Sequence, residues 1–216
     1  MNKKNLNNEM DKLKDKKPEI PEKGKNEVKK SNLHKKLVES KIITEEELKF
    51  LQKEVFETGT NKINLIYRLS SKNGFSAKKF HNKCDDKSNT FFICESDKGK
   101  KFGGINYLDW SKESVEKITD KNMLFSLSHL KTLPLRMNES GENINTRLTS
   151  KTIYYKSNCG PIMGDGDLII GDKCNKKESC SSDIETYQLD GDYDSETFLA
   201  GAAKFKIETF YIYQFA

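Results

Sequence analysis

From residue 62 onward, hydrophobic and polar positions follow the short period of β-strands. Seven stretches are rich in β-branched or aromatic residues, and clusters of Gly, Asn, Asp or Ser separate them, as is typical of strands joined by turns. These stretches are residues 62–70, 90–96, 101–110, 122–128, 152–157, 167–171 and 204–215. We therefore expect packed antiparallel sheets over this part of the chain.

Two segments between these strands have a helical pattern. Phe75, Phe80 and Cys84 are spaced to lie on one side of a short helix, and residues 111–122 (SKESVEKITDKN) are consistent with another. No repeat with a fixed period is present. The pattern predicts an α+β fold in which sheet predominates.

Residues 31–61 carry the signature of a helical extension. Thr44 can form a capping box with Glu47, and Gly59 stands where the helix would stop, so we expect a helix over about residues 45–57 after a shorter one. Its apolar face could pair with a partner helix, but fewer than three heptads are present, which favours docking on the protein's own core. The residues of this face are Leu48, Leu51 and Val55.

The polar composition is concentrated in residues 1–30, which mix Lys, Asn and Glu and lack an apolar period that could bury a face. We expect this tail to be disordered. The net charge is +5, and residues 1–62 supply most of it with 16 Lys against 12 Asp or Glu. A basic tail can attract nucleic acid or an anionic membrane. Lysine interspersed with acids is more typical of a solvated chain, so we predict no nucleic-acid partner.

The chain has neither a run of 18 apolar residues nor the apolar stretch of a signal peptide near its N-terminus. We therefore expect a cytoplasmic protein without a transmembrane segment. In that compartment the five cysteines are reduced thiols, which argues against a disulfide framework. They are Cys84, Cys94, Cys159, Cys174 and Cys180.

Residues 160–172 (GPIMGDGDLIIGD) raise the question of a phosphate or metal site. A phosphate-binding loop would need Lys where this loop has Asp, and its acids would repel a pyrophosphate. Acids also recur at every second position in residues 190–196, but the EF-hand pattern is incomplete there. We interpret both segments as acidic turns and predict no metal or cofactor.

Catalytic signatures are also missing. There is no G-x-S-x-G motif, and His81 with Cys84 supplies only part of a zinc-ligand pattern. From residue types alone, a binding or scaffold domain is favoured over an enzyme.

Five stretches, taken in order, resemble the TLDc family, the oxidation-resistance domain. They are LIYRLSSKNGFSAKKFHNKCDDKSNTFFI, KFGGINYLDWS, MLFSLSHL, YYKSNCGPIMGDGDLII and FLAGAAKFKIETFYIYQF. The resemblance covers a TLDc domain at residues 62–216, which follows the disordered tail (1–30) and the helical extension (31–61). Departures from the family pattern occur at Asn73, Met163 and Tyr211, and the last replaces an acid.

The resemblance implies a sandwich of two antiparallel sheets with short flanking helices. It also implies a non-catalytic intracellular adaptor. Such proteins protect against oxidative stress, and several bind peripheral subunits of the vacuolar proton pump, the V-ATPase, and favour its disassembly. The alternative is a thiol-based antioxidant or an unrecognised enzyme.

Three groups of site residues follow from the sequence. Asp165 and Asp167, on a glycine-held turn, are candidates for an exposed partner-binding rim, and the alternative is that Asp167 only forms hydrogen bonds within the turn. Cys174 and Cys180, beside lysines in a polar loop, are candidate reactive thiols, whereas Cys94 is expected to face inward. The residues expected to shape turns or close strand contacts are Gly74, Gly103, Gly104, Gly160, Pro161, Gly164 and Gly166.

Overall fold

The computed structural model of the chain describes residues 31–56, 60, 62–69, 74–111, 113, 116–117, 119–136 and 153–216. Residues 31–216 form one compact unit, which contains the whole described fold. The predicted tail, and the expectations for Gly59 and Asn73, lie outside the described residues. Among the described helices, none has the length and apolar character needed to cross a membrane.

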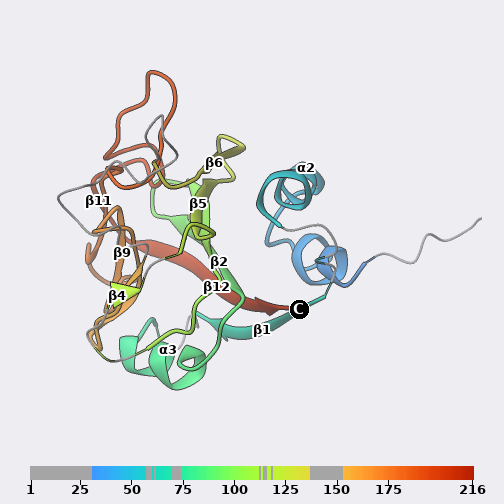
Figure 1. The fold of residues 1–216 in the computed structure, drawn as a ribbon, viewed down its shortest axis with the longest axis horizontal. Helices are drawn as coiled ribbons and strands as arrows, with labels where there is room; N and C mark the ends of the chain where they lie inside the picture. Colours follow the sequence, from blue (N-terminus) through green and yellow to red (C-terminus); the bar gives the residue numbers. More distant parts are fainter. Residues whose placement is uncertain are drawn as a thin grey trace, which may run out of the picture. The chain divides into compact units, whose positions relative to one another are not determined.

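Two antiparallel six-stranded sheets make up most of the described chain, and Figure 1 shows them as two layers. The first sheet contains, in order, β1 (Ile63–Arg68), β12 (Ile207–Phe215), β2 (Thr90–Ser96), β3 (Lys101–Asn106), β5 (Met123–Ser126) and β6 (Lys131–Leu133). The second contains β11 (Lys204–Phe205), β10 (Cys180–Ser182), β9 (Leu168–Gly171), β8 (Cys159–Met163), β7 (Ile153–Tyr154) and β4 (Glu116–Lys117). The predicted α+β sandwich is confirmed.

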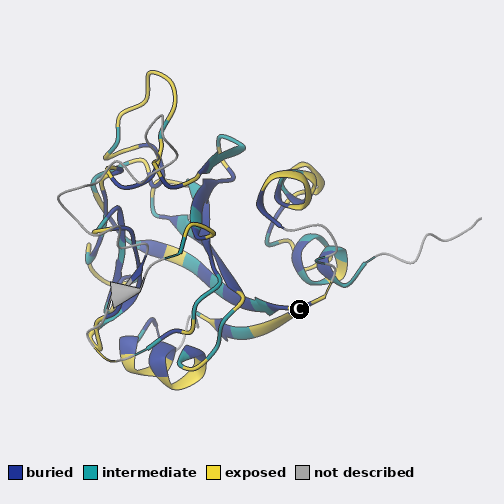
Figure 2. Ribbon diagram, viewed as in Figure 1, coloured by how far each residue is buried: buried dark blue, intermediate teal, exposed yellow. Residues whose placement is uncertain are grey.

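One apolar core fills the space between the two sheets. Alternation along β12 turns Phe210 and Ile212 into this core, while Tyr213 faces the other side of the sheet. Phe102 of β3 meets Phe205 of β11 edge to face, with ring centroids 5.7 Å apart. This contact joins the sheets directly, and Figure 2 shows the buried strands that surround it.

The helix α3 (Ala77–Cys84) closes one end of this core. Ser76 caps it, and its buried side carries Phe80, His81 and Cys84. The predicted inward face of this segment is therefore confirmed.

A second core lies between the opposite face of the first sheet and a helical segment. This segment comprises the π-helical turn η2 (His34–Glu39), the helix α2 (Glu45–Phe50) and its π-helical continuation η3 (Leu51–Val55). Thr44 and Glu47 form the predicted capping box. The predicted docking face packs against the sheet through Leu48, Leu51 and Val55, which share a buried cluster with Phe91, Ile93 and Ile105.

Glycine permits a close approach of β3 to its neighbours. A Cβ atom on Gly103 would lie 2.0 Å from the carbonyl oxygen of Phe92, and one on Gly104 would lie 2.9 Å from the Phe92 ring. The pairing of β2 with β3 has no register shift, so the two glycines serve the predicted close strand contact and do not form a bulge. Both positions require glycine because of packing.

Some elements differ from the sequence pattern. The helix expected over residues 111–122 is wrong, because Glu116–Lys117 forms β4 and pairs with β7. The sequence pattern predicts a turn and a polar loop where the structure has β8 and β10. β8 forms a hairpin with the neighbouring β9, whereas β10 enters the sheet by pairing with β9 and with β11, which lies further along the chain.

Candidate functional site

The acidic turn between β8 and β9 is the first candidate site. Gly164 has φ of 66° and Gly166 has φ of 114°, so the turn uses backbone conformations that favour glycine. A Cβ on Gly164 would lie 2.3 Å from Oδ1 of Asp167. Gly164 therefore lets the chain reverse and also leaves space for the carboxylate that follows.

Asp167 is buried at this turn, with an exposed fraction of 2%. Its Oδ2 accepts hydrogen bonds from the backbone N–H groups of Glu185 (2.9 Å), Thr186 (2.7 Å) and Tyr187 (3.0 Å). Burial raises the pKa of the carboxyl, and these hydrogen bonds oppose that effect. The expectation that Asp167 forms an exposed partner-binding rim is wrong, because its carboxylate organises the neighbouring loop.

Asp165, by contrast, is exposed at the tip of the turn. Its backbone N–H donates to Oγ1 of Thr186 at 3.2 Å, which ties the tip to the same loop. The turn thus holds the Asp165 side chain on a braced backbone at the surface. Partner binding by Asp165 stays a prediction.

The remaining structural residues also lie at tight places. Gly74 has φ of 63°, and the backbone N–H of Phe75 next to it donates to Oδ1 of Asn175 at 3.1 Å. A Cβ on Gly160 would lie 2.6 Å from the Phe75 ring. Pro161 is buried in β8. These contacts hold the end of α3 against the second sheet.

The two candidate reactive thiols are buried completely. The neighbouring thiol of Cys180, together with burial, raises the pKa of Cys174. The expectation of an accessible thiolate at Cys174 and Cys180 is wrong. Both side chains point into the core between the sheets, away from the lysines of their loop.

The other cysteines share this character. Cys84 and Cys94 are buried as well, and burial raises the pKa of both thiols, to about 12 for Cys84. Cys159 alone among the described cysteines is partly exposed, and burial raises its pKa too. Low thiolate content is expected at each of these three positions near neutral pH.

His81 anchors α3 to the start of β8. Its Nδ1 lies 2.8 Å from Oδ1 of Asp85, and its Nε2 lies 3.0 Å and 3.1 Å from the carbonyl oxygens of Lys156 and Cys159. All three partners present oxygen atoms to the two ring nitrogens. This arrangement gives His81 a positioning role in the fold.

The acidic segment at residues 190–196 lies at the surface. Asp194 accepts hydrogen bonds from the backbone N–H and the hydroxyl of Thr197, both at 2.8 Å, as in the cap of a turn. Across the described ranges, no group of three or more His, Cys, Asp or Glu side chains is arranged to hold a metal ion.

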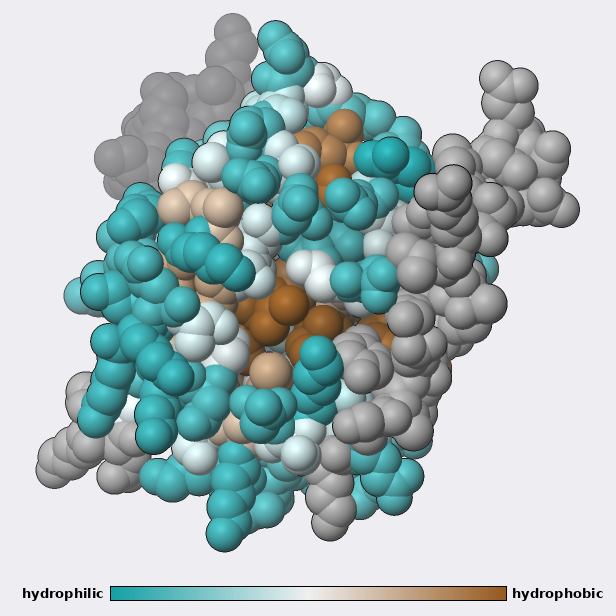
Figure 3. Space-filling view, turned by 90° about the vertical axis from the view of Figure 1, so that its left-hand side faces the viewer, coloured by the Kyte–Doolittle hydropathy of each residue, from teal (hydrophilic) through white to brown (hydrophobic). Residues whose placement is uncertain are grey.

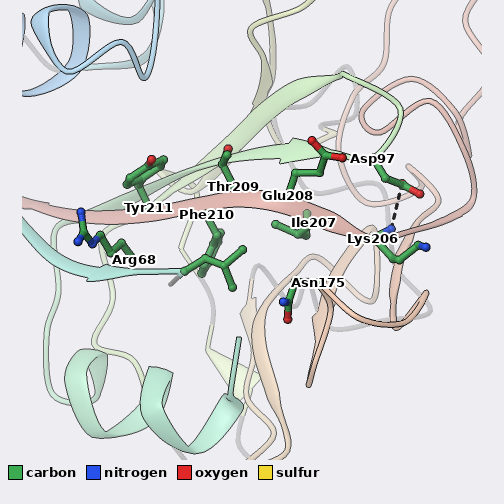
Figure 4. Close-up of a pocket in the computed structure, with 10 residues that line it drawn as sticks. Arg68, Asp97, Asn175, Lys206, Ile207, Glu208, Thr209, Phe210 and Tyr211 are labelled. Carbon is green, nitrogen blue, oxygen red and sulfur yellow. Dashed lines mark hydrogen bonds between the residues drawn. The ribbon is translucent and has the colours of Figure 1, made fainter. Parts of the chain in front are cut away.

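A surface hollow of about 560 Å³ lies where β1 ends beside β12. Figure 4 shows Arg68 and Tyr211 at one end of it and Lys206, whose N–H donates to Asp97, at the other. Arg68 and Tyr211 are cross-strand partners. The sequence analysis did not select Arg68, although it is one of only three arginines and ends a predicted strand.

The outer face of the second sheet carries an apolar pair. Ile162 and Ile169 are cross-strand partners, and they point away from the core because Met163, Leu168 and Ile170 point into it. Figure 3 looks onto the side where Figure 1 labels β4, β9 and β11, and apolar side chains gather near the middle of that face.

Comparison with known families places these features in context. The model of the TLDc domain matches residues 36–216. The match begins within η2 and continues through both sheets, so it includes the helical segment as well as the sandwich. The domain boundary expected at residue 62 stays a prediction. No curated protein matches the chain.

Proposed function

The chain belongs to the TLDc family, and from this membership we propose that it is a non-catalytic cytoplasmic adaptor that protects against oxidative stress. Its proposed partners are peripheral subunits of the V-ATPase, whose disassembly it would favour. The observation that carries the proposal is the family match over 181 of 216 residues, from 36 to 216. The resemblance of the ordered motifs to the family supports the same role.

The braced turn at Asp165 is the proposed contact for this partner. A rigid, exposed acid suits a basic patch on another protein, and losing one such pair weakens binding by about 0.5–3 kcal/mol, depending on its desolvation. Asp167 is not part of the contact, since it is buried beneath the turn.

The test is capture of purified V-ATPase peripheral subunits by the immobilised full chain. We expect capture by the natural protein and by Asp192→Asn, which removes an exposed acid away from the turn. Asp165→Asn should reduce capture while thermal stability stays unchanged. No capture by the natural protein, under conditions where another family member binds, would reject the pump as partner.

The thiol-based alternative is not favoured by the structure. Four of the five cysteines are buried, and the two nominated as reactive are among them. A protein with Cys174→Ala and Cys180→Ala should still protect cells from peroxide as long as it remains folded. If this variant folds normally but no longer protects cells from peroxide, thiol chemistry becomes the favoured function.

A further inference from the structure

The strand β1 forms an outer edge of the first sheet, with β12 as its partner. In Figure 1 it runs along the border of the sheet, next to the helical segment. At its start, the N–H of Ile63 donates to Oδ1 of Asn32 at 2.9 Å, and Nζ of Lys36 donates to the carbonyl oxygen of Ile63 at 2.5 Å. Side chains therefore satisfy the first outward-facing backbone position of this edge.

The next outward-facing position is Leu65, because backbone groups alternate between the two sides of a strand. A register shift between Leu65 and Tyr67 then interrupts this alternation, so an added strand meets a β-bulge beyond Leu65. From Leu65 to Arg68, no described residue forms a hydrogen bond with a backbone group on this outer side of β1. Nζ of Lys36 also donates to Oδ1 of the Asn64 side chain at 3.2 Å. Leu65 is 44% exposed, an unusual value for a large hydrophobic residue in this protein. An edge with open backbone groups and an exposed apolar side chain can receive another strand.

Two hollows border this edge, and both are basic. The hollow on the α3 side, of about 390 Å³, is lined in part by Arg68, Lys79 and Lys83. The hollow on the η2 side, of about 300 Å³, contains Lys36 and Arg68 around Leu65 and Tyr211. Among the described residues that line them, neither hollow has Asp or Glu.

Two lysines of α3, Lys79 and Lys83, indicate that the hollow on the α3 side binds an anionic group. Lys79 and Lys83 are exposed and four residues apart, so their charges repel across one helical turn. Neither forms an ion pair with any residue in the described ranges. An anion between them and Arg68 would relieve this repulsion.

Candidate occupants from the chain itself fit poorly. Residues 1–30 hold ten Lys against six acids, so this segment has the same sign as the edge. A second copy would bring the same basic hollows, with Arg68 in both of them, to the same edge, and like charges that meet across a strand pair destabilise it.

We propose that β1 receives an extended, acidic segment of a partner protein as an added strand. Its backbone pairs with the edge from Leu65 onward, its apolar side chains cover Leu65 and Tyr211, and its carboxylates face Arg68, Lys79 and Lys83. This rests on the proposed adaptor role but concerns a surface remote in sequence from Asp165, and it does not depend on which protein supplies the segment.

The test uses the purified full chain and a short fluorescent peptide that alternates Glu and Val, with a Lys–Val peptide as its control. Anisotropy at low salt should show binding of the acidic peptide only. Lys79→Glu with Lys83→Glu should weaken binding about tenfold or more. Lys78→Glu, an exposed change on the same helix outside the hollow, should leave it within about twofold.

Two further measurements identify strand addition. N-methylation of the alternate peptide nitrogens that face β1 should abolish binding, because it removes the N–H groups that pair with the strand. N-methylation of the nitrogens that face away from β1 should not. Amide hydrogen exchange should slow over residues 64–68 in the complex. Protection elsewhere, equal effects of the two charge variants, or equal competition by an oligonucleotide would overturn the proposal.

Failure here is distinguishable from failure of the adaptor proposal. The peptide assay contains no V-ATPase, so absent peptide binding rejects the edge as a docking site even where the pump is captured. If the acidic peptide binds but V-ATPase subunits are not captured, β1 remains a docking site and the V-ATPase is rejected as the partner.

Discussion

At the scale of single residues, the contrast between Asp165 and Asp167 shows how the surroundings decide the role of an acid. Both belong to one turn, yet only Asp167 receives three backbone N–H donors, from residues 185–187. These donors compensate the carboxylate for lost hydration and fix the loop that carries them. Asp165, two residues earlier, stays at the surface.

Asp167→Asn should therefore destabilise the protein by about 1–3 kcal/mol, because the amide oxygen can accept from the three donors but lacks the negative charge that strengthens these bonds, and its NH2 group takes the buried position of Oδ1. Asp165→Asn should change the free energy of unfolding by less than about 0.5 kcal/mol. Urea denaturation of both variants measures this difference. Equal losses would show that the buried hydrogen bonds are not what stabilises the loop.

Residue roles were predictable from the sequence where the cause is local. The capping box of Thr44 and Glu47 spans three residues, and its signature was sufficient. The burial of Asp167 depends on donors 18 to 20 residues away. The burial of Cys174 and Cys180 likewise depends on a sheet that brings distant strands over them. The lysines next to them in the sequence therefore wrongly indicate accessible thiolates.

At the scale of elements, the helical segment completes the first sheet. It covers the face that carries Phe91, Ile93 and Ile105, and it satisfies the start of β1 through Asn32 and Lys36. These contacts bury apolar surface that a sandwich of two sheets alone would expose.

Two truncations separate the segment from the tail. Removing residues 1–30 should leave the melting temperature almost unchanged, because their sequence has no apolar face to bury. Removing residues 1–56 should expose the second core and cause aggregation. Thermal scans and size-exclusion chromatography provide the measurements. A fall of several degrees after the first truncation, or a soluble monomer after the second, would contradict the assignment.

Elements with several consecutive β-branched or aromatic residues were predictable, as β2 and β12 illustrate. β4 was not, because its Glu116 and Lys117 have no strand character and pairing with β7 decides their conformation. β10 is similarly polar at the sequence level, with two serines after Cys180. Long-range pairing overrides local preference in these short strands.

At the scale of the whole molecule, the cores hold thiol and phenol groups in their neutral form. Burial raises the pKa of Cys84 from 9.0 to about 12 and that of Tyr67 from 10.0 to about 12. The unfolded chain loses these protons first as the pH rises. The folded state then binds more protons than the unfolded state, so stability falls with increasing pH.

The free energy of unfolding should therefore be steady up to about pH 8 and decrease above about pH 9, where unfolded thiols ionise. Urea midpoints measured from pH 7 to 11 under reducing conditions test this. Tyr67→Phe should lessen the slope above pH 10 and serves as the matched variant. A flat profile through pH 11 would mean that these groups ionise without unfolding.

The position of β12 has a consequence for how the protein acquires its structure. β12 follows every other described strand in the chain, yet it lies between β1 and β2. Until it inserts, β1 has no partner in the sheet and β2 presents an open edge. Because such contacts join residues far apart in sequence, they form late and slowly. A nascent chain that has been synthesised only as far as β11 still exposes the unpaired backbone groups of β2. The yield of folded protein should therefore depend on chaperones that cover this edge until β12 has been synthesised.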